Sequence, residues 1–160
     1  MSVAVYPGSF DPITLGHLDV LQRATGIFDK VYIAVLQNPS KSPLFSVEER
    51  MEMIRASVDN PRVEVDSFDG LIVDYARRIN AGSIVKGLRA VSDFESEFQQ
   101  ALFNRKLAPD ITTVFLMTGF ANVFLSSSLV KEVARFGGDV SFAVPPVVAD
   151  RLARLNRRDG

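Results

Sequence analysis

The sequence contains one histidine, and the residues before it give that histidine a chemical role. His17 follows Gly16 in the segment Thr14-Leu15-Gly16-His17, where a predicted helix begins. Free N–H groups and the helix dipole make the first turn of a helix favourable for an anion. Gly16 removes a side chain that would keep a phosphate from those groups. A lone histidine is more often a helix cap or a packed side chain, but this context favours a phosphate site.

Cations occupy two other predicted loops. Lys41 lies in the turn-rich segment 38–43, whose alternative interpretation is a solvated surface loop. Lys86 and Arg89 surround Gly87 at the end of a predicted strand. Ammonium and guanidinium groups donate strong hydrogen bonds to phosphate oxygens, and a glycine lets the backbone join them. This pattern predicts a phosphate clamp, with an exposed pair of surface cations as the alternative.

Consecutive serines at 126–128 precede a segment of helical period that begins with Leu129. Serine is a favoured N-cap because its hydroxyl accepts a hydrogen bond from a free backbone N–H. Capping alone would explain the run. The stronger interpretation adds hydroxyl and N–H contacts to a β- or γ-phosphate.

The elements that must position these residues are short apolar runs that alternate with segments of helical period. Strands are predicted at residues 3–6, 31–36, 63–65, 83–85 and 112–117. Successive βα units predict an α/β fold: a Rossmann-like, doubly wound five-stranded parallel sheet with helices on both faces. Such sheets bind ligands beyond the carboxyl ends of their strands. The histidine, the cations and the serines are all expected at that edge.

The predicted helices rest on apolar stripes and on terminal signals. Ser46 and Glu49 form a capping box before one helix. Apolar stripes mark two later helices, at Phe94, Phe98, Ala101 and Leu102 and at Leu129, Val133 and Phe136. A last helix is expected over residues 146–157.

Composition limits the classes of protein and partner. The chain has 160 residues, which suits a single domain spanning 1–160. With 18 Lys and Arg against 19 Asp and Glu, the net charge is −1, so no global field attracts a polyanion and nucleic acid is not an expected partner. The sequence has no cysteine and no run long enough for a membrane span. We therefore expect a cytoplasmic protein with no membrane partner.

The loop after the first strand lacks both the G-x-G-x-x-G fingerprint and the G-x-x-x-x-G-K-[ST] loop. Instead the chain resembles the nucleotidylyltransferase superfamily, and within it the bacterial phosphopantetheine adenylyltransferases. The resemblance rests on residues 6–12, 14–17, 86–89 and 126–132, which read YPGSFDP, TLGH, KGLR and SSSLVKE. These segments occur in the order of the family and cover nearly the whole chain.

The resemblance implies transfer of an adenylyl group from ATP to 4′-phosphopantetheine, giving dephospho-coenzyme A and pyrophosphate. His17 would stabilise the transition state at the α-phosphorus. The acceptor would contact Ser9, Lys41, Ile72 and Lys86. ATP would contact Ser9, Phe10, His17, Gly87, Leu88, Arg89, Glu97, Asn122, Val123, Phe124, Leu125, Ser126, Ser127 and Ser128. Family members are hexamers that require Mg²⁺ and are inhibited by coenzyme A.

Some positions depart from the family pattern. Lys86 stands where the family often has arginine, which keeps the charge but not the bidentate geometry. Ser96 and Asn122 stand where aromatic residues are common. The chemistry needs no general base, because a phosphate monoester has a second pKa near ~6 and is largely a dianion at neutral pH. With no acidic cluster in the motifs, Mg²⁺ would be held mainly by phosphate oxygens and water.

Competing interpretations remain open at the level of sequence. A related nucleotidylyltransferase could act on another phosphate, such as a mononucleotide or a sugar phosphate. A non-catalytic nucleotide-binding module would bind ATP without releasing pyrophosphate. A fragment of a class I tRNA synthetase would share the histidine, but the chain has no segment for reading tRNA.

Overall fold

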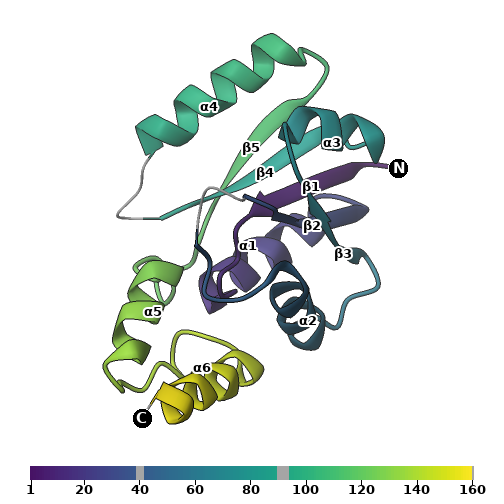
Figure 1. Cartoon of the computed structure of the whole chain (residues 1–160). Helices are drawn as coiled ribbons and strands as arrows, with labels where there is room; N and C mark the ends of the chain where they lie inside the picture. The colour runs from purple at the N-terminus through teal and green to yellow at the C-terminus, as the bar shows by residue number, and fades with distance from the viewer. Residues whose placement is uncertain (39–41, 90–93, 160) are drawn as a thin grey trace.

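The computed structural model describes residues 1–38, 42–89 and 94–159. Its strands are β1 (Val3–Gly8), β2 (Lys30–Leu36), β3 (Val63–Phe68), β4 (Ser83–Leu88) and β5 (Thr112–Met117). They form one sheet in the order β3-β2-β1-β4-β5, and every neighbouring pair is parallel. The predicted five-stranded parallel sheet is confirmed (Figure 1).

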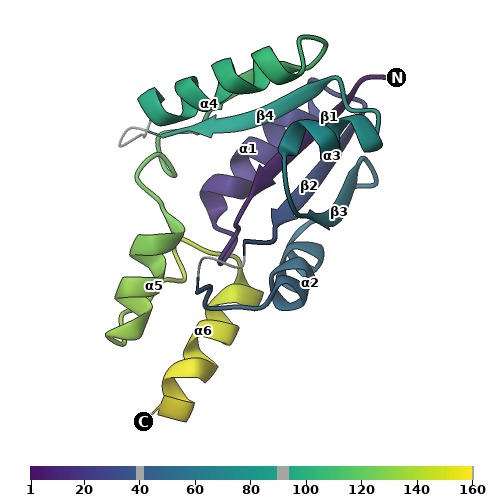
Figure 2. The same cartoon turned by 45° about the horizontal axis from the view of Figure 1, so that its top comes forward.

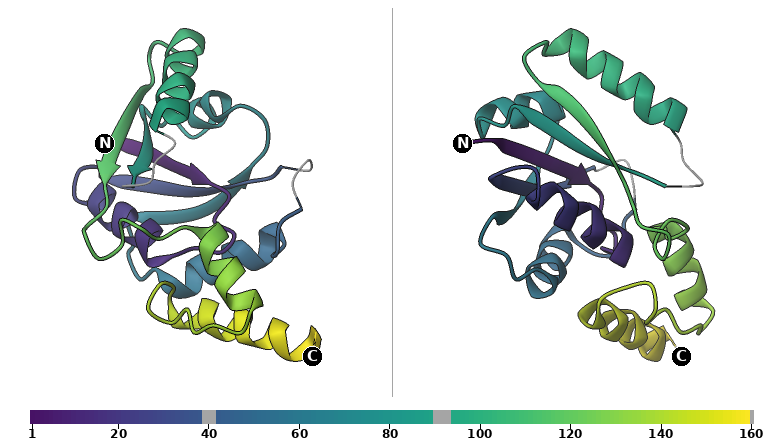
Figure 3. Two further views of the ribbon diagram at one scale, coloured as in Figure 1. Left: turned by 90° about the vertical axis from the view of Figure 1, so that its left-hand side faces the viewer. Right: turned by 180° about the vertical axis from the view of Figure 1, so that it is seen from behind.

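The helices are α1 (Leu15–Thr25), α2 (Val47–Ser57), α3 (Ile72–Arg78), α4 (Phe94–Leu107), α5 (Ser127–Arg135) and α6 (Pro146–Asp159). Figures 1 and 2 show α1 and α2 on one face of the sheet and α3 and α4 on the other. Because α5 and α6 pack together beyond the sheet, they add a second layer on the side of α1 and α2 (Figure 3). No described helix is both long and apolar enough to cross a membrane.

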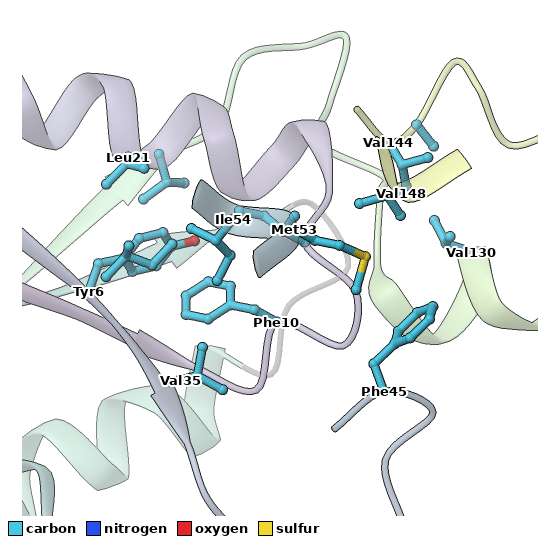
Figure 4. Close-up of a cluster of buried hydrophobic side chains, with 14 of the residues drawn as sticks. Tyr6, Phe10, Leu21, Val35, Phe45, Met53, Ile54, Val130, Val144 and Val148 are labelled. Atoms are coloured by element: carbon cyan, nitrogen blue, oxygen red, sulfur yellow. The ribbon is translucent and has the colours of Figure 1, made fainter. Parts of the chain in front are cut away.

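Two buried clusters lie on opposite faces of the sheet. The larger one joins β1 and β2 to α1, α2, α5 and α6, and Figure 4 shows the Met53 side chain between Phe10 and Phe45. The smaller one packs α3 against β1 and β4, with Tyr75 donating a hydrogen bond to Asp66 at 2.8 Å. A buried methionine such as Met53 contributes about 2–5 kcal/mol relative to alanine. The larger cluster is therefore a major source of the rigidity of the β1–α1 connection.

Strand β1 runs beyond the predicted end at Tyr6 and includes Pro7. A proline interrupts a ladder because it has no N–H. However, β1 pairs with β4 only at Ala4 and Val5, so Pro7 lies beyond that ladder and meets only the β2 side. The two central strands thus separate toward their carboxyl ends. This separation lies at the switch point of the sheet, where doubly wound folds bind ligands.

The apolar stripes placed two helices correctly but did not predict their buried faces. Helix α4 carries Phe98 at 49% and Leu102 at 45% exposure, and β5 is the element of the described chain that packs most closely against it. Helix α5 buries Val130 and Ala134, whereas Phe136 is exposed at 76%. The stripe on α4 is therefore an exposed apolar surface of this chain.

Candidate active site

The separation of β1 and β4 opens two adjoining cavities at the carboxyl edge of the sheet. One has a volume of about 290 Å³ and lies toward α2 and α5. The other has a volume of about 420 Å³ and lies toward β4 and α4. The two share Ser9, Phe10, His17, Leu36 and Arg89 in their walls. The size suits a nucleotide-sized ligand together with a second substrate.

His17 lies on the wall common to both cavities, held by the start of its own helix. Its Nδ1 accepts a hydrogen bond from the backbone N–H of Thr14 at 3.0 Å, while the Thr14 hydroxyl accepts from the N–H of His17 at 3.3 Å. This reciprocal pair is a capping box. Since Nδ1 must be an acceptor, the ring proton is on Nε2, at the opposite edge of the ring. Capping and a chemical role therefore use different nitrogens.

The imidazole is neutral at physiological pH. Burial first, and then the positive charge of Arg89, lower the pKa of His17 from its ordinary 6.5 to about 4. The ring of Phe10 packs edge-on against it at 5.0 Å between centroids. A neutral ring with its proton on Nε2 is a hydrogen-bond donor for developing negative charge, not a base.

Gly16 lies close to the loop after β5. A Cβ there would lie 3.4 Å from the carbonyl oxygen of Asn122. The loop after β5 thus lies within van der Waals contact of the first turn of α1, at a distance that does not itself require glycine. Within the loop, Leu125 lines the larger cavity, whereas Asn122, Val123 and Phe124 line neither one.

The predicted clamp after β4 is assembled around a tight contact. A Cβ on Gly87 would lie 2.9 Å from Val20 Cγ2, so glycine lets β4 pack against α1. Lys86 Nζ lies 3.4 Å from Glu97 Oε2, and both side chains line the larger cavity. Arg89 donates to the carbonyl of Leu125 at 3.2 Å. Leu88 lines neither cavity; its carbonyl accepts from Thr118.

The serines at 126–128 were predicted to cap a helix and to contact a phosphate. Ser126 caps α5 by accepting from the N–H of Leu129 at 3.1 Å. Ser127 donates to the carbonyl of Pro12 at 2.7 Å, which joins α5 to the loop after β1. All three serines line the smaller cavity at the N-terminus of α5. Capping is thus real for Ser126, and the smaller cavity faces the helix end that suits phosphates.

Sequence reasoning missed several polar residues of the smaller cavity. Lys131 forms an ion pair with Asp11 at 3.1 Å, and Asp11 also accepts from the amides of Leu44 and Phe45. The buried Arg50 lines the same cavity. Asp11 and Lys131 lie inside two of the motifs quoted above and could have been found there. Arg50 had no such signal.

One predicted acceptor contact is not in these walls, and another falls outside the described residues. Ile72 begins α3 and packs against the smaller core cluster, and it lines neither cavity. Lys41 lies outside the described residues. Ser9 and Lys86 are the acceptor-side predictions that the structure brings to the cavities.

Comparison with known proteins shows the family to which the chain belongs. Residues 5–133 match the family described as cytidylyltransferase-like, so the chain belongs to this nucleotidyltransferase family. A phosphopantetheine adenylyltransferase of Caldanaerobacter subterraneus subsp. tengcongensis is 58% identical over 95% of the chain and 96% of its own length. One of Heliobacterium modesticaldum is 58% identical, covering 96% and 92%. The chain belongs to the phosphopantetheine adenylyltransferases.

The solved structure of a protein from Vibrio parahaemolyticus, described as a "putative nicotinate-nucleotide adenylyltransferase", superposes on this chain with a TM-score of 0.70 at 17% sequence identity. The match covers 95% of this chain and 91% of that one. At this identity the likeness supports the Rossmann-like fold and carries no argument about substrate.

Proposed function

We propose that the chain transfers the adenylyl group of ATP to 4′-phosphopantetheine, giving dephospho-coenzyme A and pyrophosphate. The observation that carries this proposal is the position of His17, a neutral donor on the wall between two polar cavities. Two substrates that each bring a phosphate would meet at that wall. The acceptor is named from the relatives, which are phosphopantetheine adenylyltransferases.

The reaction is a direct displacement at the α-phosphorus of ATP. An oxygen of the acceptor phosphate forms the new bond, the bond to the β-phosphate oxygen breaks, and pyrophosphate leaves with that electron pair. The acceptor is already a dianion, so no side chain has to remove a proton. The protein must align the two phosphates and stabilise charge on the α-phosphoryl oxygens. The Nε2–H of His17 is the donor suited to the second task.

The smaller cavity suits the β- and γ-phosphates of ATP. Ser126, Ser127 and Ser128 supply hydroxyls and the free N–H groups of α5. The larger cavity offers Lys86 to the acceptor phosphate, and Ser9 stands at both. On the ATP side we further assign Phe10 and Arg89, which line both cavities, and, from the family pattern, Gly87, Leu88, Glu97 and the loop 122–125. Because Gly87, Glu97 and Leu125 line the larger cavity, we propose that part of the nucleotide extends into it beside the acceptor. Lys41 and Ile72 stay acceptor-side proposals from the family pattern.

Mg²⁺ is the cofactor that the family pattern implies. Within the described ranges, no three acidic or histidine side chains gather as a metal site. The carboxylates in the cavity walls, Asp11 and Glu97, each face a lysine. These residues fit an ion carried by the phosphates of ATP, which would neutralise charge on them. We therefore propose Mg²⁺ held by phosphate oxygens and water.

The exposed stripe on α4 supports self-association. Phe94, Phe98 and Leu102 recur at helical spacing and are 42%, 49% and 45% exposed. Such a stripe is typical of a surface that another copy covers. We propose that the chain forms a homohexamer, as the family pattern implies. We further propose that the enzyme is cytoplasmic and is inhibited by coenzyme A. Sedimentation of the purified chain tests the assembly, and Phe98→Glu should dissociate it.

The activity is tested by measuring pyrophosphate release. We expect release only when ATP, Mg²⁺ and 4′-phosphopantetheine are present together. Pantetheine, which lacks the attacking phosphate, is the matched control and should give none. A panel with a mononucleotide and a sugar phosphate tests the acceptor. Turnover of pantetheine, or a preference for another phosphate, would overturn the proposed reaction.

A further inference from the structure

The guanidinium of Arg50 is buried beside the smaller cavity and forms no ion pair with any carboxylate in the described part of the chain. The residue is 4% exposed and lies in the first turns of α2. Its Nη1 donates to the Ser9 carbonyl at 2.8 Å and its Nε to the Ser46 carbonyl at 3.3 Å. No ion pair among the described residues includes it. Burying an unpaired cation is costly, so the position needs a reason.

The residue that follows Ser9 has an unusual backbone. Phe10 has φ 46°, in the left-handed region that residues other than glycine rarely adopt. A backbone of this kind persists only where its surroundings fix it, and such residues cluster at functional sites. The hydrogen bond from Arg50 holds the carbonyl that enters this turn. Ser9 and Phe10 are also residues that line both cavities.

Fixing the Ser9 carbonyl also fixes the next N–H. The carbonyl and N–H of a trans peptide point in opposite directions, and the Ser9–Phe10 bond is not a cis bond. With the carbonyl directed at Arg50, the Phe10 N–H points away from it. That N–H has no hydrogen-bond partner in the described part of the chain. An unpaired amide in a cavity wall is a donor held ready for a ligand.

We propose that Arg50 is a positioning residue, which orients the Ser9–Phe10 peptide so that the Phe10 N–H binds a phosphate oxygen of the nucleotide. The positive charge of Arg50 lies behind this peptide and favours the same anion. The proposal rests on the proposed function, because it assigns the phosphate to ATP. Arg50 itself reaches the reacting atoms only through the peptide that it holds.

Three variants separate this role from simple packing. Arg50→Met removes both hydrogen bonds and the charge. Arg50→Lys keeps the charge and a single donor for the Ser9 carbonyl. Arg55→Met is the matched control, since Arg55 is an exposed arginine in the last turn of the same helix. For each, kcat and KM are measured per folded molecule, together with the melting temperature and the Kd of a non-hydrolysable ATP analogue by calorimetry.

Removing one preorganised donor typically lowers kcat by about 10²–10³-fold. Arg50→Met misplaces the Phe10 N–H but does not remove it, so we expect kcat to fall by about 10- to 100-fold. The Kd of the analogue should rise in parallel, Arg50→Lys should recover most of both, and Arg55→Met should match the wild type. A merely structural arginine would lower the melting temperature and leave both quantities unchanged per folded molecule. That result would overturn the proposal.

The two hypotheses fail in different ways. If the wild type releases no pyrophosphate from ATP and 4′-phosphopantetheine, the proposed function is wrong. The calorimetric comparison of wild type and Arg50→Met with the ATP analogue then still decides whether Arg50 supports a phosphate site. Equal Kd values in that comparison would sink the role of Arg50 alone.

Discussion

Asp19 accepts a hydrogen bond from the backbone N–H of Gly119 at 2.6 Å, across a separation of 100 residues. Asp19 stands on α1, close after His17, and Gly119 begins the loop that leads from β5 to α5. The bond therefore holds the proposed nucleotide loop against the helix that carries the proposed donor. A carboxylate that accepts from an amide makes one of the stronger hydrogen bonds in proteins.

Replacing Asp19 should loosen that loop. We expect Asp19→Ala to raise the KM for ATP by about tenfold, because a hydrogen bond to a charged group contributes about 1.5–3 kcal/mol. The effect on kcat should be smaller. Asp19→Asn keeps an acceptor oxygen, so its KM for ATP should lie between those of the wild type and Asp19→Ala. Arg23→Ala removes the largely exposed ion pair with Asp19 and keeps the bond to Gly119, so it serves as the control. Equal effects of Asp19→Ala and Arg23→Ala would exclude a specific role for the amide contact.

The capping box at His17 allows catalysis to be separated from stability. His17→Ala should lower kcat by about 10²–10³ if Nε2–H stabilises the transition state. It should also lose part of the cap, which is typically worth about 0.5–2 kcal/mol. Glutamine is a natural partner in a capping box, so His17→Gln should keep the melting temperature and still lose the rate. A His17→Gln protein with near-normal kcat would remove His17 from the mechanism.

The pKa of His17 can be read directly, because the chain has a single histidine. Burial and Arg89 lower this pKa to about 4 in the folded state. The two imidazole C–H resonances of this histidine should therefore titrate near pH 4 in the free protein. Between about 4 and 6.5 the unfolded chain binds the extra proton, so His17 contributes stability that is complete above about 6.5 and is lost as pH falls toward 4. A midpoint near 6.5 would mean that the ring is solvated.

Lys86 should serve the acceptor more than ATP. We expect Lys86→Ala to raise the KM for 4′-phosphopantetheine by about tenfold or more, because a charge-assisted contact contributes about 1.5–3 kcal/mol. The same change leaves the buried oxygen of Glu97 without its lysine, so a loss of stability is expected too. The double variant Lys86→Ala, Glu97→Gln should regain the melting temperature but not acceptor affinity. Lys86→Arg should be better tolerated than alanine.

For Lys86, calorimetry with each substrate alone is the deciding measurement. A fall in ATP affinity with intact acceptor affinity would reverse the assignment of the two cavities.

Much of this site was predictable because its parts are local. The first turn of α1, the strand-end cations and the serine run are each contained in a few consecutive residues, and the parallel sheet brings them to one edge. The role of Arg50 was not predictable, since its contact with Ser9 joins residues 41 apart and depends on how α2 packs. The same holds for Asp11 and Lys131, which are 120 apart.

The buried faces of helices were a further limit of the sequence. A stripe such as Phe98 and Leu102 shows that a helix has an apolar side, but not what lies against that side. Likewise, Pro7 led us to end the first strand at Tyr6, whereas the structure continues β1 through Pro7 along β2. The strand can continue because β1 has already separated from β4 there, and this separation depends on strand pairing and not on the local residues.

The ion pair between Asp11 and Lys131 joins the loop after β1 to a helix that follows all of the described strands in the sequence. Those strands lie within residues 3–117, whereas the smaller cavity takes its serines and Lys131 from the segment that begins at Ser126. A chain that had formed its sheet without docking α5 would therefore have a phosphate pocket open on one side. The capacity to bind a nucleotide thus depends on the packing of α5 as well as on the sheet.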